Sequence, residues 1–131
     1  MEKTTHDRTP SGRESEDGVV FDAIVVGAGF GGLYMLHSLR KLGFTCRVFE
    51  AGGGVGGTWY WNRYPGVACD VISYDYLPLL DEMNYVPKRR YSGGEEILEH
   101  SRAIARKYGL YDLAVFQTTV TSTVSVSPES N

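Results

Sequence analysis

The chain has 131 residues, which is enough for one domain with a modest core and too few for a two-domain enzyme with two cofactors. Its 13 Lys and Arg against 16 Asp and Glu give a net charge of −3, so it has no excess of basic charge for nucleic acid or an anionic membrane. Glycine is the unusual feature of the composition, with 16 residues where a chain of this length usually has about nine.

Residues 1–18 are polar and contain no apolar segment of signal-peptide type, so we expect a disordered tail there. No stretch of the chain approaches the roughly 20 apolar residues that span a bilayer. Cys46 and Cys69 form no CxxC motif and have no nearby histidine pair, which predicts neither a disulfide framework nor a metal site. A reducing, cytoplasmic location is therefore the default expectation.

The chain takes on the pattern of a folded domain from residue 19. Residues 19–26 are mostly β-branched and apolar, which predicts a strand buried on both faces, as in a parallel sheet. Four glycines within residues 27–32 end it, residues 33–42 carry a helical apolar stripe, and residues 45–50 form a second strand. Gly43 is placed to end the helix. Together these segments predict a βαβ unit and an α/β fold.

The middle of the chain is less periodic. Residues 52–66, GGGVGGTWYWNRYPG, fit neither a helical nor a strand period and predict a long ordered loop. Residues 70–80 are ambiguous between a short helix and a turn.

A second helix is predicted near the C-terminal end. Ser92 and Glu95 have the spacing of a capping box, helical periodicity follows, and Gly109 is placed to end it. Residues 113–120 suggest another strand. The folded region is accordingly expected over residues 19–126, with a polar tail over residues 127–131.

Gly27, Gly29 and Gly32 fit the GxGxxG motif between a predicted strand and a predicted helix. The first glycine permits the tight turn, the second lets the backbone approach a pyrophosphate, and the third lets the helix pack on the sheet. Glu50 ends the next strand, where a carboxylate accepts ribose hydroxyls and disfavours a 2′-phosphate. This pattern fits FAD or NAD. The alternatives are a glycine-rich turn without a nucleotide and a solvated acid at a strand end.

The loop after Glu50 favours FAD. An NAD dehydrogenase would proceed directly to its next helix, whereas this chain has Trp59, Tyr60, Trp61 and Tyr64. Such side chains can wall a flat flavin ring from water. The alternative is that these aromatic residues form ordinary core or a hydrophobic patch.

These motifs together resemble a known family. GAGFGG, then Glu50, then GGVGGTWYWNRYPGVACD is similar to the N-terminal flavin-binding region of class B flavoprotein monooxygenases, within them the Baeyer–Villiger monooxygenases. The similarity runs from Phe21 to about Val120. It implies a Rossmann-like FAD-binding βαβ domain with a parallel sheet, incomplete relative to the family. In the complete family, NADPH reduces FAD and O₂ is used to convert a ketone into an ester or lactone.

The resemblance also implies roles for individual residues. The pyrophosphate turn matches Gly27, Gly29, Phe30 and Gly32, and the ribose-binding acid matches Glu50. The flavin-side segment matches Thr58, Trp59, Tyr60, Trp61 and Tyr76. The position between flavin and nicotinamide matches Ala68, Cys69 and Asp70, of which Asp70 is the candidate catalytic acid and a turn N-cap its alternative role. A backbone contact to adenine matches Val120.

The chain also departs from the family pattern. Ile72 stands where the family often has an acid, and a second GxGxxG and the His- and Trp-containing signature are absent. His37 and His100 fall in predicted helices and are expected to pack rather than react. We therefore expect a truncated enzyme or one part of a split one, whose partners are FAD and a separate chain carrying the NADPH and substrate regions. The alternatives are a non-catalytic FAD-binding fragment and a small NAD-binding dehydrogenase domain.

Overall fold

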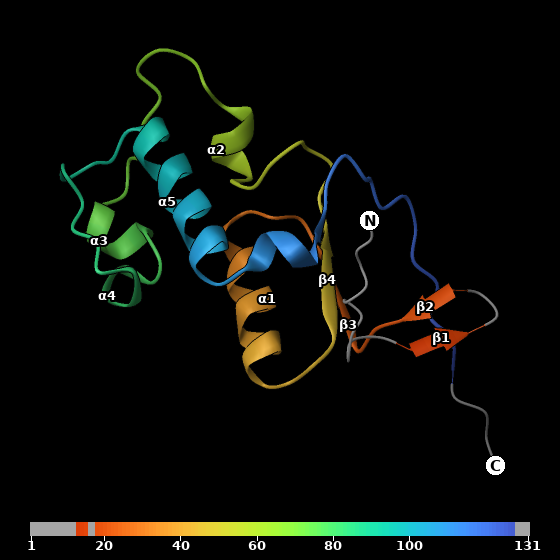
Figure 1. Ribbon diagram of the computed structural model, residues 1–131. Helices are drawn as coiled ribbons and strands as arrows, with labels where there is room; N and C mark the ends of the chain where they lie inside the picture. Colours follow the sequence, from red (N-terminus) through yellow and green to blue (C-terminus); the bar gives the residue numbers. More distant parts are fainter. Residues whose placement is uncertain (1–12, 16–17, 128–131) are drawn as a thin grey trace, which may run out of the picture.

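The computed structural model describes residues 13–15 and 18–127. Its centre is a parallel sheet of three strands, β3 (Ala23–Val26), β4 (Cys46–Phe49) and β5 (Ala114–Val115), in the order β3-β4-β5. Helix α1 (Phe30–Lys41) packs on one face of this sheet, and α5 (Gly94–Lys107) packs against α1 (Figure 1). This is the expected α/β fold with a parallel sheet.

The remaining elements are short. An antiparallel hairpin, β1 (Arg13–Ser15) and β2 (Gly18–Val20), precedes the sheet, and its first strand lies where the sequence predicts no element. Three helices of one turn each, α2 (Thr58–Trp61), α3 (Ser73–Tyr76) and α4 (Leu80–Met83), connect β4 to α5. A 3₁₀ helix, η2 (Leu110–Leu113), leads from α5 into β5.

The predicted βαβ unit is confirmed. Leu33 and Leu36 on α1 are fully buried beside Val48 of β4, which is the packing that the apolar stripe predicts. The helix ends one residue before Leu42, and Gly43 follows with φ +91°, a conformation that glycine adopts without strain. The prediction of a helix stop at this glycine is correct.

The prediction of one strand buried on both faces over residues 19–26 is wrong. The segment divides at Asp22, whose backbone N–H and carboxylate bond the hydroxyl and the N–H of Thr45 at 2.8 Å each. Residues 18–20 belong to the exposed hairpin instead. Within β3, Ile24 and Val26 remain 44% and 63% exposed, because no described helix covers that face of the sheet.

The second predicted helix is present as α5, but its predicted capping box is not. The N-cap is Gly93, without a side-chain hydrogen bond, and the Ser92 hydroxyl lies 2.7 Å from that of Ser73 instead. Gly109 ends the helix region with φ +66°, as predicted. The strand expected over residues 113–120 is limited to β5.

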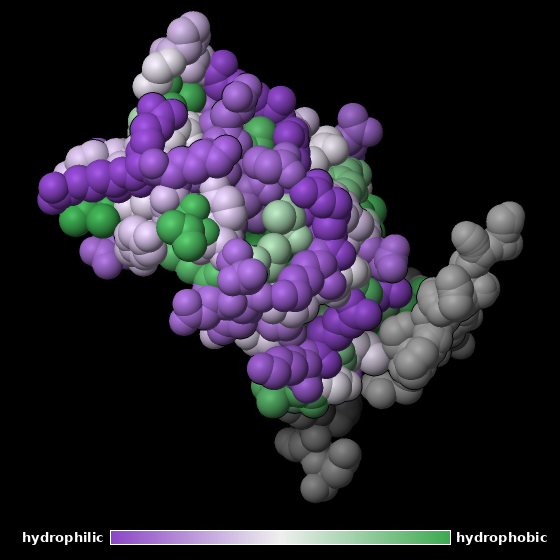
Figure 2. All heavy atoms as spheres, turned by 60° about the vertical axis from the view of Figure 1, so that its left-hand side comes forward, coloured by the Kyte–Doolittle hydropathy of each residue, from purple (hydrophilic) through white to green (hydrophobic). Residues whose placement is uncertain are grey.

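The buried residues form two clusters. One lies between the sheet, α1 and α5, and the other lies between α2, α3 and α5 around Trp59 and Ile97. Figure 2 shows the side that carries α3 and α4, where hydrophilic residues dominate and apolar ones form separate spots. Over the described part of the chain, no helix has the length and apolar character required to cross a membrane.

Candidate functional site

The glycine turn between β3 and α1 has the geometry of a phosphate-binding turn. Gly27 has φ +96°, which strains any other residue. A Cβ on Gly32 would lie 1.8 Å from the carbonyl oxygen of Gly27, so the helix can approach the strand this closely only with glycine there. A Cβ on Gly29 would make an ordinary contact of 3.5 Å with Gly57. The fold therefore requires glycine at positions 27 and 32. It does not require glycine at position 29, where a bound ligand would be the reason for the absence of a side chain.

The start of α1 presents free hydrogen-bond donors. Among the residues that the structure describes, no acceptor bonds the backbone N–H groups of Gly29, Phe30, Gly31 and Gly32. The first turn of the helix contains no acidic side chain, and its N-cap makes no side-chain bond. Unpaired N–H groups at the positive end of a helix dipole form an anion site.

Glu50 lies immediately after β4, beside this turn, and is only 5% exposed. Its Oε1 accepts a hydrogen bond from Ala28 N–H and its Oε2 accepts one from Gly52 N–H, both at 2.7 Å. A carboxylate oxygen can accept more than one bond, so both oxygens retain capacity for ribose hydroxyls. The alternative of a solvated strand-end acid is wrong. Glu50 also holds the turn and the following loop together, a role that the sequence does not reveal.

The loop over residues 52–57 packs directly on the glycine turn. Gly56 N–H donates to the Ala28 carbonyl at 2.9 Å, and a Cβ on Gly57, which has φ +56°, would lie 2.9 Å from the Gly29 Cα. Gly53 N–H donates to the hydroxyl of Tyr60 at 2.9 Å. Sequence reasoning missed Gly52 and Gly57 as site residues; the run of consecutive glycines was the available signal.

The chain after β5 returns to the same place. Glu50 N–H donates to the Val115 carbonyl, and Thr118 N–H donates to the Glu50 carbonyl, both at 2.9 Å. Gln117 N–H donates to the Gly52 carbonyl at the same distance. Val120 follows two residues later and is half-buried. The structure therefore brings the chain leading to Val120 beside Glu50 and the glycine loop.

The predicted aromatic wall does not form a single surface. Residues 58–61 are a turn of helix rather than extended loop, and a helix rotates successive side chains by about 100°. Trp59 is buried, and its Nε1–H donates to the Tyr76 hydroxyl at 2.8 Å. Trp61 is 62% exposed. A Cβ built on Gly52 would lie 3.1 Å from both the Trp61 ring and the Glu50 carboxylate, so these two side chains approach Gly52 from the same side.

Phe30, Trp59 and Tyr76 meet in one aromatic cluster at the start of α1. The Tyr76 ring lies edge-on to both of the others, with centroids 6.0 Å from Phe30 and 6.1 Å from Trp59. His100 is buried beside Phe30, and its Nε2 lies 2.7 Å from the Pro78 carbonyl oxygen. His37 contacts the ring of Tyr108, with centroids 4.0 Å apart. The expected packing roles of both histidines are confirmed.

Asp70 is exposed and makes no hydrogen bond or ion pair with the described residues. The N-cap of α3 is Ile72, which makes no side-chain cap bond, so the alternative role of Asp70 as a turn N-cap is wrong. The preceding residues are fixed against the start of α5: Ala68 forms a β-bridge with Gly93, and buried Cys69 donates its N–H to Ser92 at 3.0 Å. The carboxylate thus projects from an anchored backbone.

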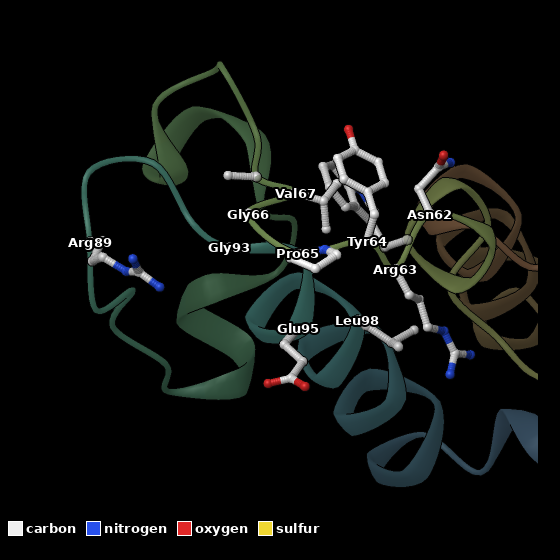
Figure 3. A pocket seen from close by; sticks show the side chains of 13 residues that line it. Asn62, Arg63, Tyr64, Pro65, Gly66, Val67, Arg89, Gly93, Glu95 and Leu98 are labelled. Atoms are coloured by element: carbon white, nitrogen blue, oxygen red, sulfur yellow. The ribbon is translucent and has the colours of Figure 1, made fainter.

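A pocket of about 440 Å³ lies between the loop over residues 62–68 and the start of α5 (Figure 3). Its walls include Tyr64 and Pro65 from the loop and Leu98 from the helix, with Arg63 and Arg89 at its ends. Trp59 and Ala68 are the predicted site residues that line it. Because neither the glycine turn nor Glu50 reaches it, this pocket is separate from the anion site.

A second polar cluster joins α5 to the segment after α4. The Tyr85 hydroxyl donates to Glu96, which also accepts the Lys88 N–H at 3.0 Å. Burial raises the pKa of Tyr85 to about 12, reinforced by the bond to Glu96 and its charge. Burial alone would raise the pKa of Glu96, but the bonds from Tyr85, Lys88 and Ser92 outweigh it and lower that pKa.

Within residues 13–15 and 18–127, no His, Cys, Asp and Glu side chains gather in a group that could hold a metal ion.

Comparison with known proteins agrees with this geometry. Residues 25–78 match the family described as an NAD(P)-binding Rossmann-like domain. Baeyer–Villiger monooxygenase 4 of Dietzia sp. is 55% identical over 101 residues, which are 76% of this chain and 16% of that protein. The polycyclic ketone monooxygenase of Thermothelomyces thermophilus is 46% identical over 110 residues, 80% of this chain and 17% of that protein.

Solved structures extend the similarity to the fold. An oxidized steroid monooxygenase bound to NADP superposes with a TM-score of 0.70 at 43% identity, covering 74% of this chain and 19% of that one. Cyclohexanone monooxygenase bound to ε-caprolactone gives 0.76 at 39% identity, covering 81% and 22%. The chain spans about a sixth of the length of the curated relatives it matches. In sequence and in fold, the chain is similar to one part of the Baeyer–Villiger monooxygenases, the part that contains the glycine turn, Glu50 and the aromatic loop.

Proposed function

We propose that this chain binds FAD, with the pyrophosphate at the start of α1 and the adenosine ribose at Glu50. The observation that carries the proposal is the pairing of two features on neighbouring strand ends. Four N–H groups of residues 29–32 lack acceptors, and the Glu50 carboxylate beside them is held by Ala28 and Gly52. A phosphate would satisfy the donors, and ribose hydroxyls would occupy the remaining acceptor capacity of the carboxylate.

The arrangement supports FAD or another nucleotide without a 2′-phosphate, because a phosphate would meet the buried negative charge of Glu50. Trp61 lies on the Glu50 side of the loop, which supports a place for it near the ribose rather than at the flavin ring. Phe30, Trp59 and Tyr76 form an aromatic cluster at the start of α1, which supports an apolar contact for the flavin ring there.

The proposed activity is that of the relatives: NADPH- and O₂-dependent oxygenation of a ketone to an ester or lactone, with FAD supplying the redox chemistry. This chain's residues would bind and orient the flavin. Asp70, an exposed carboxylate on an anchored backbone, is proposed to orient a cationic group beside it. The NADPH and substrate regions would come from a separate chain. Two buried free cysteines, Cys46 and Cys69, support a reducing, cytoplasmic setting.

One absorption spectrum of the purified chain, followed by titration of the apoprotein with FAD and with NAD, tests the proposal. Bound FAD gives a yellow protein that absorbs near ~450 nm. Binding of NAD but not FAD would favour the dehydrogenase alternative. Failure to bind either nucleotide by a chain with a native circular dichroism spectrum would leave a non-catalytic fold and contradict the proposal.

The activity test must identify the product. We expect no label from ¹⁸O₂ in any ester or lactone when the chain alone is given NADPH and a ketone, because about 110 folded residues cannot both hold and enclose a flavin. Incorporation only after a complementary family fragment is added would support a split enzyme. Incorporation by the chain alone, abolished by Asp70→Ala, would contradict the need for a second chain.

A further inference from the structure

Gln117 has an unusual backbone conformation. Three described residues other than glycine have positive φ, and two of them, Leu79 and Asn84, flank α4 as its caps. The third is Gln117, with φ +53°, on the exposed segment that follows β5. Left-handed backbone is unfavourable for a glutamine, whereas glycine adopts it without strain. The turn alone therefore does not account for the glutamine side chain at this position.

Hydrogen bonds on both sides of Gln117 fix this conformation. Gln117 N–H donates to the Gly52 carbonyl and Thr118 N–H donates to the Glu50 carbonyl, both at 2.9 Å. The Thr118 hydroxyl donates to the Phe116 carbonyl at 3.0 Å. The backbone that carries the glutamine is thus held against the loop that follows Glu50.

The side-chain amide of Gln117 lies at this loop and has no protein partner. A Cβ built on Gly53 would lie 3.9 Å from the Gln117 Nε2 and 3.0 Å from the Tyr60 hydroxyl oxygen, so both polar groups face the same side of Gly53. Within the described part of the chain, the Gln117 side chain makes no hydrogen bond. An amide carries a donor and an acceptor side by side, so on a fixed backbone it suits a ligand group with the complementary pair.

The position of this amide relative to Glu50 indicates which group of a nucleotide it meets. The Glu50 carboxylate bonds the glycine turn through Oε1 and Gly52 through Oε2, and Gly52 in turn bonds Gln117. The phosphate donors, Glu50 and Gln117 therefore follow one another across the site. The ADP part of FAD presents its phosphates, ribose and base in the same order. With the pyrophosphate at the turn and the ribose at Glu50, the base reaches Gln117.

We propose that Gln117 recognises the adenine base of the bound nucleotide. Its amide oxygen accepts a hydrogen bond from the N6 amino group and its amide N–H donates to N7, the pairing that the side chains of Asn and Gln make with adenine. Hypoxanthine has an oxo group in place of the amino group, so it presents two acceptors at this edge and satisfies only half of the amide. The inference rests on the proposed function, which supplies the positions of the phosphate and the ribose.

The test titrates the full chain with FAD and with flavin hypoxanthine dinucleotide, and follows binding by the change in flavin absorbance. The parent should bind FAD at least about fivefold more tightly than the hypoxanthine analogue, because the analogue loses one bond and leaves its partner unpaired. Gln117→Met keeps the length and the backbone conformation of the side chain but lacks the amide. It should lower the ratio of the two dissociation constants at least about fivefold.

The matched control is Thr119→Ala, at an exposed residue of the same segment, which should leave that ratio within about twofold of the parent value. Gln117→Gly removes the amide and also relieves the positive φ, so it should fold and show the same loss of base preference even if Gln117→Met does not fold.

Two results would overturn the inference. Equal weakening of both dinucleotides in the Gln117 variants would show that the glutamine only shapes the loop, and an unchanged ratio would show that it is a solvated surface residue. The proposed function fails separately. A parent chain that binds neither dinucleotide contradicts both proposals, whereas one that binds both dinucleotides equally contradicts only the role of Gln117.

Discussion

Two regions of the molecule are stabilised in different ways. In the βαβ unit of β3, α1 and β4, backbone geometry sets the structure: Gly32 permits a contact that no side chain could share, and β3 and β4 pair in regular register. In the region from α2 to the start of α5, hydrogen bonds between side chains hold the structure together. Trp59 bonds Tyr76, Ser73 bonds Ser92, and the longest helix has four residues.

Because of this difference, the two regions suit different roles: the βαβ unit suits phosphate binding, and the aromatic region suits positioning of the ring. The βαβ unit presents unpaired N–H groups whose direction is fixed by the helix axis, which suits an anion common to many nucleotides. The aromatic region carries side chains whose positions depend on one another, which suits recognition of one particular ring. Substitutions in the first region should therefore act on the fold or on phosphate binding, and those in the second should act locally.

The largest expected effect is at Gly32. A Cβ there would lie 1.8 Å from the Gly27 carbonyl oxygen, so Gly32→Ala must separate α1 from β3. We expect a loss of more than about 4 kcal/mol of unfolding free energy, or no folded protein, measured by urea denaturation. Gly31→Ala is the control, because nothing lies within 4 Å of its Cβ and alanine favours a helix. Similar stability of the two variants would show that the close helix contact is wrong.

Gly29→Val separates phosphate binding from folding. A Cβ at Gly29 makes only an ordinary contact with Gly57, so the fold should be retained, while branched carbons occupy the proposed phosphate position. FAD titration should show at least about a hundredfold weaker binding, which is about 2.7 kcal/mol. Met35→Ala, at an exposed position on the same helix, should bind FAD like the parent. Parental FAD affinity in Gly29→Val would place the phosphate elsewhere.

Glu50 contributes to both regions, because it joins the glycine turn to the aromatic loop. Glu50→Gln removes the charge and sets an amide N–H₂ against one of two backbone donors, so we expect a loss of about 1.5–3 kcal/mol in stability. FAD affinity should fall by about 10- to 150-fold. A change below twofold in a folded variant would leave Glu50 a purely structural residue.

The sequence predicted the βαβ unit because the spacing of its apolar residues and the positions of its glycines depend directly on backbone geometry. It also located the motif of the resembling family, from Gly27 to Asp70. It did not predict that Ile24 and Val26 are exposed, because β-branched residues look alike on covered and open faces. The capping box failed because Ser92 has a tertiary partner, Ser73, that no local spacing reveals. Likewise, Trp59 and Trp61 are two positions apart in sequence, and only the helical turn of α2 turns their side chains in different directions.

The smallest predicted effect concerns the hydrogen bond between Tyr85 and Glu96 and the pH dependence of the stability that it contributes. The folded-state pKa of Glu96 is lowered, so its interactions stabilise the protein above the ordinary glutamate pKa and are lost as the pH falls through the folded value. Tyr85→Phe removes one of the bonds responsible and should cost about 1 kcal/mol near neutral pH, with a smaller difference from the parent in acid. Thermal unfolding from pH 7 down to pH 3 measures it.

Tyr111→Phe is the matched control for this last substitution, because Tyr111 is exposed and contacts Phe116 through its ring alone. It should follow the parent at every pH. FAD affinity should be unchanged in both variants, since the bonds of the Tyr85 hydroxyl and of Glu96 involve neither the glycine turn nor Glu50. A Tyr85→Phe profile parallel to that of the parent down to pH 3 would show that Glu96 does not depend on the tyrosine hydroxyl. The α5 start would then be held by its backbone bonds, as the βαβ unit is.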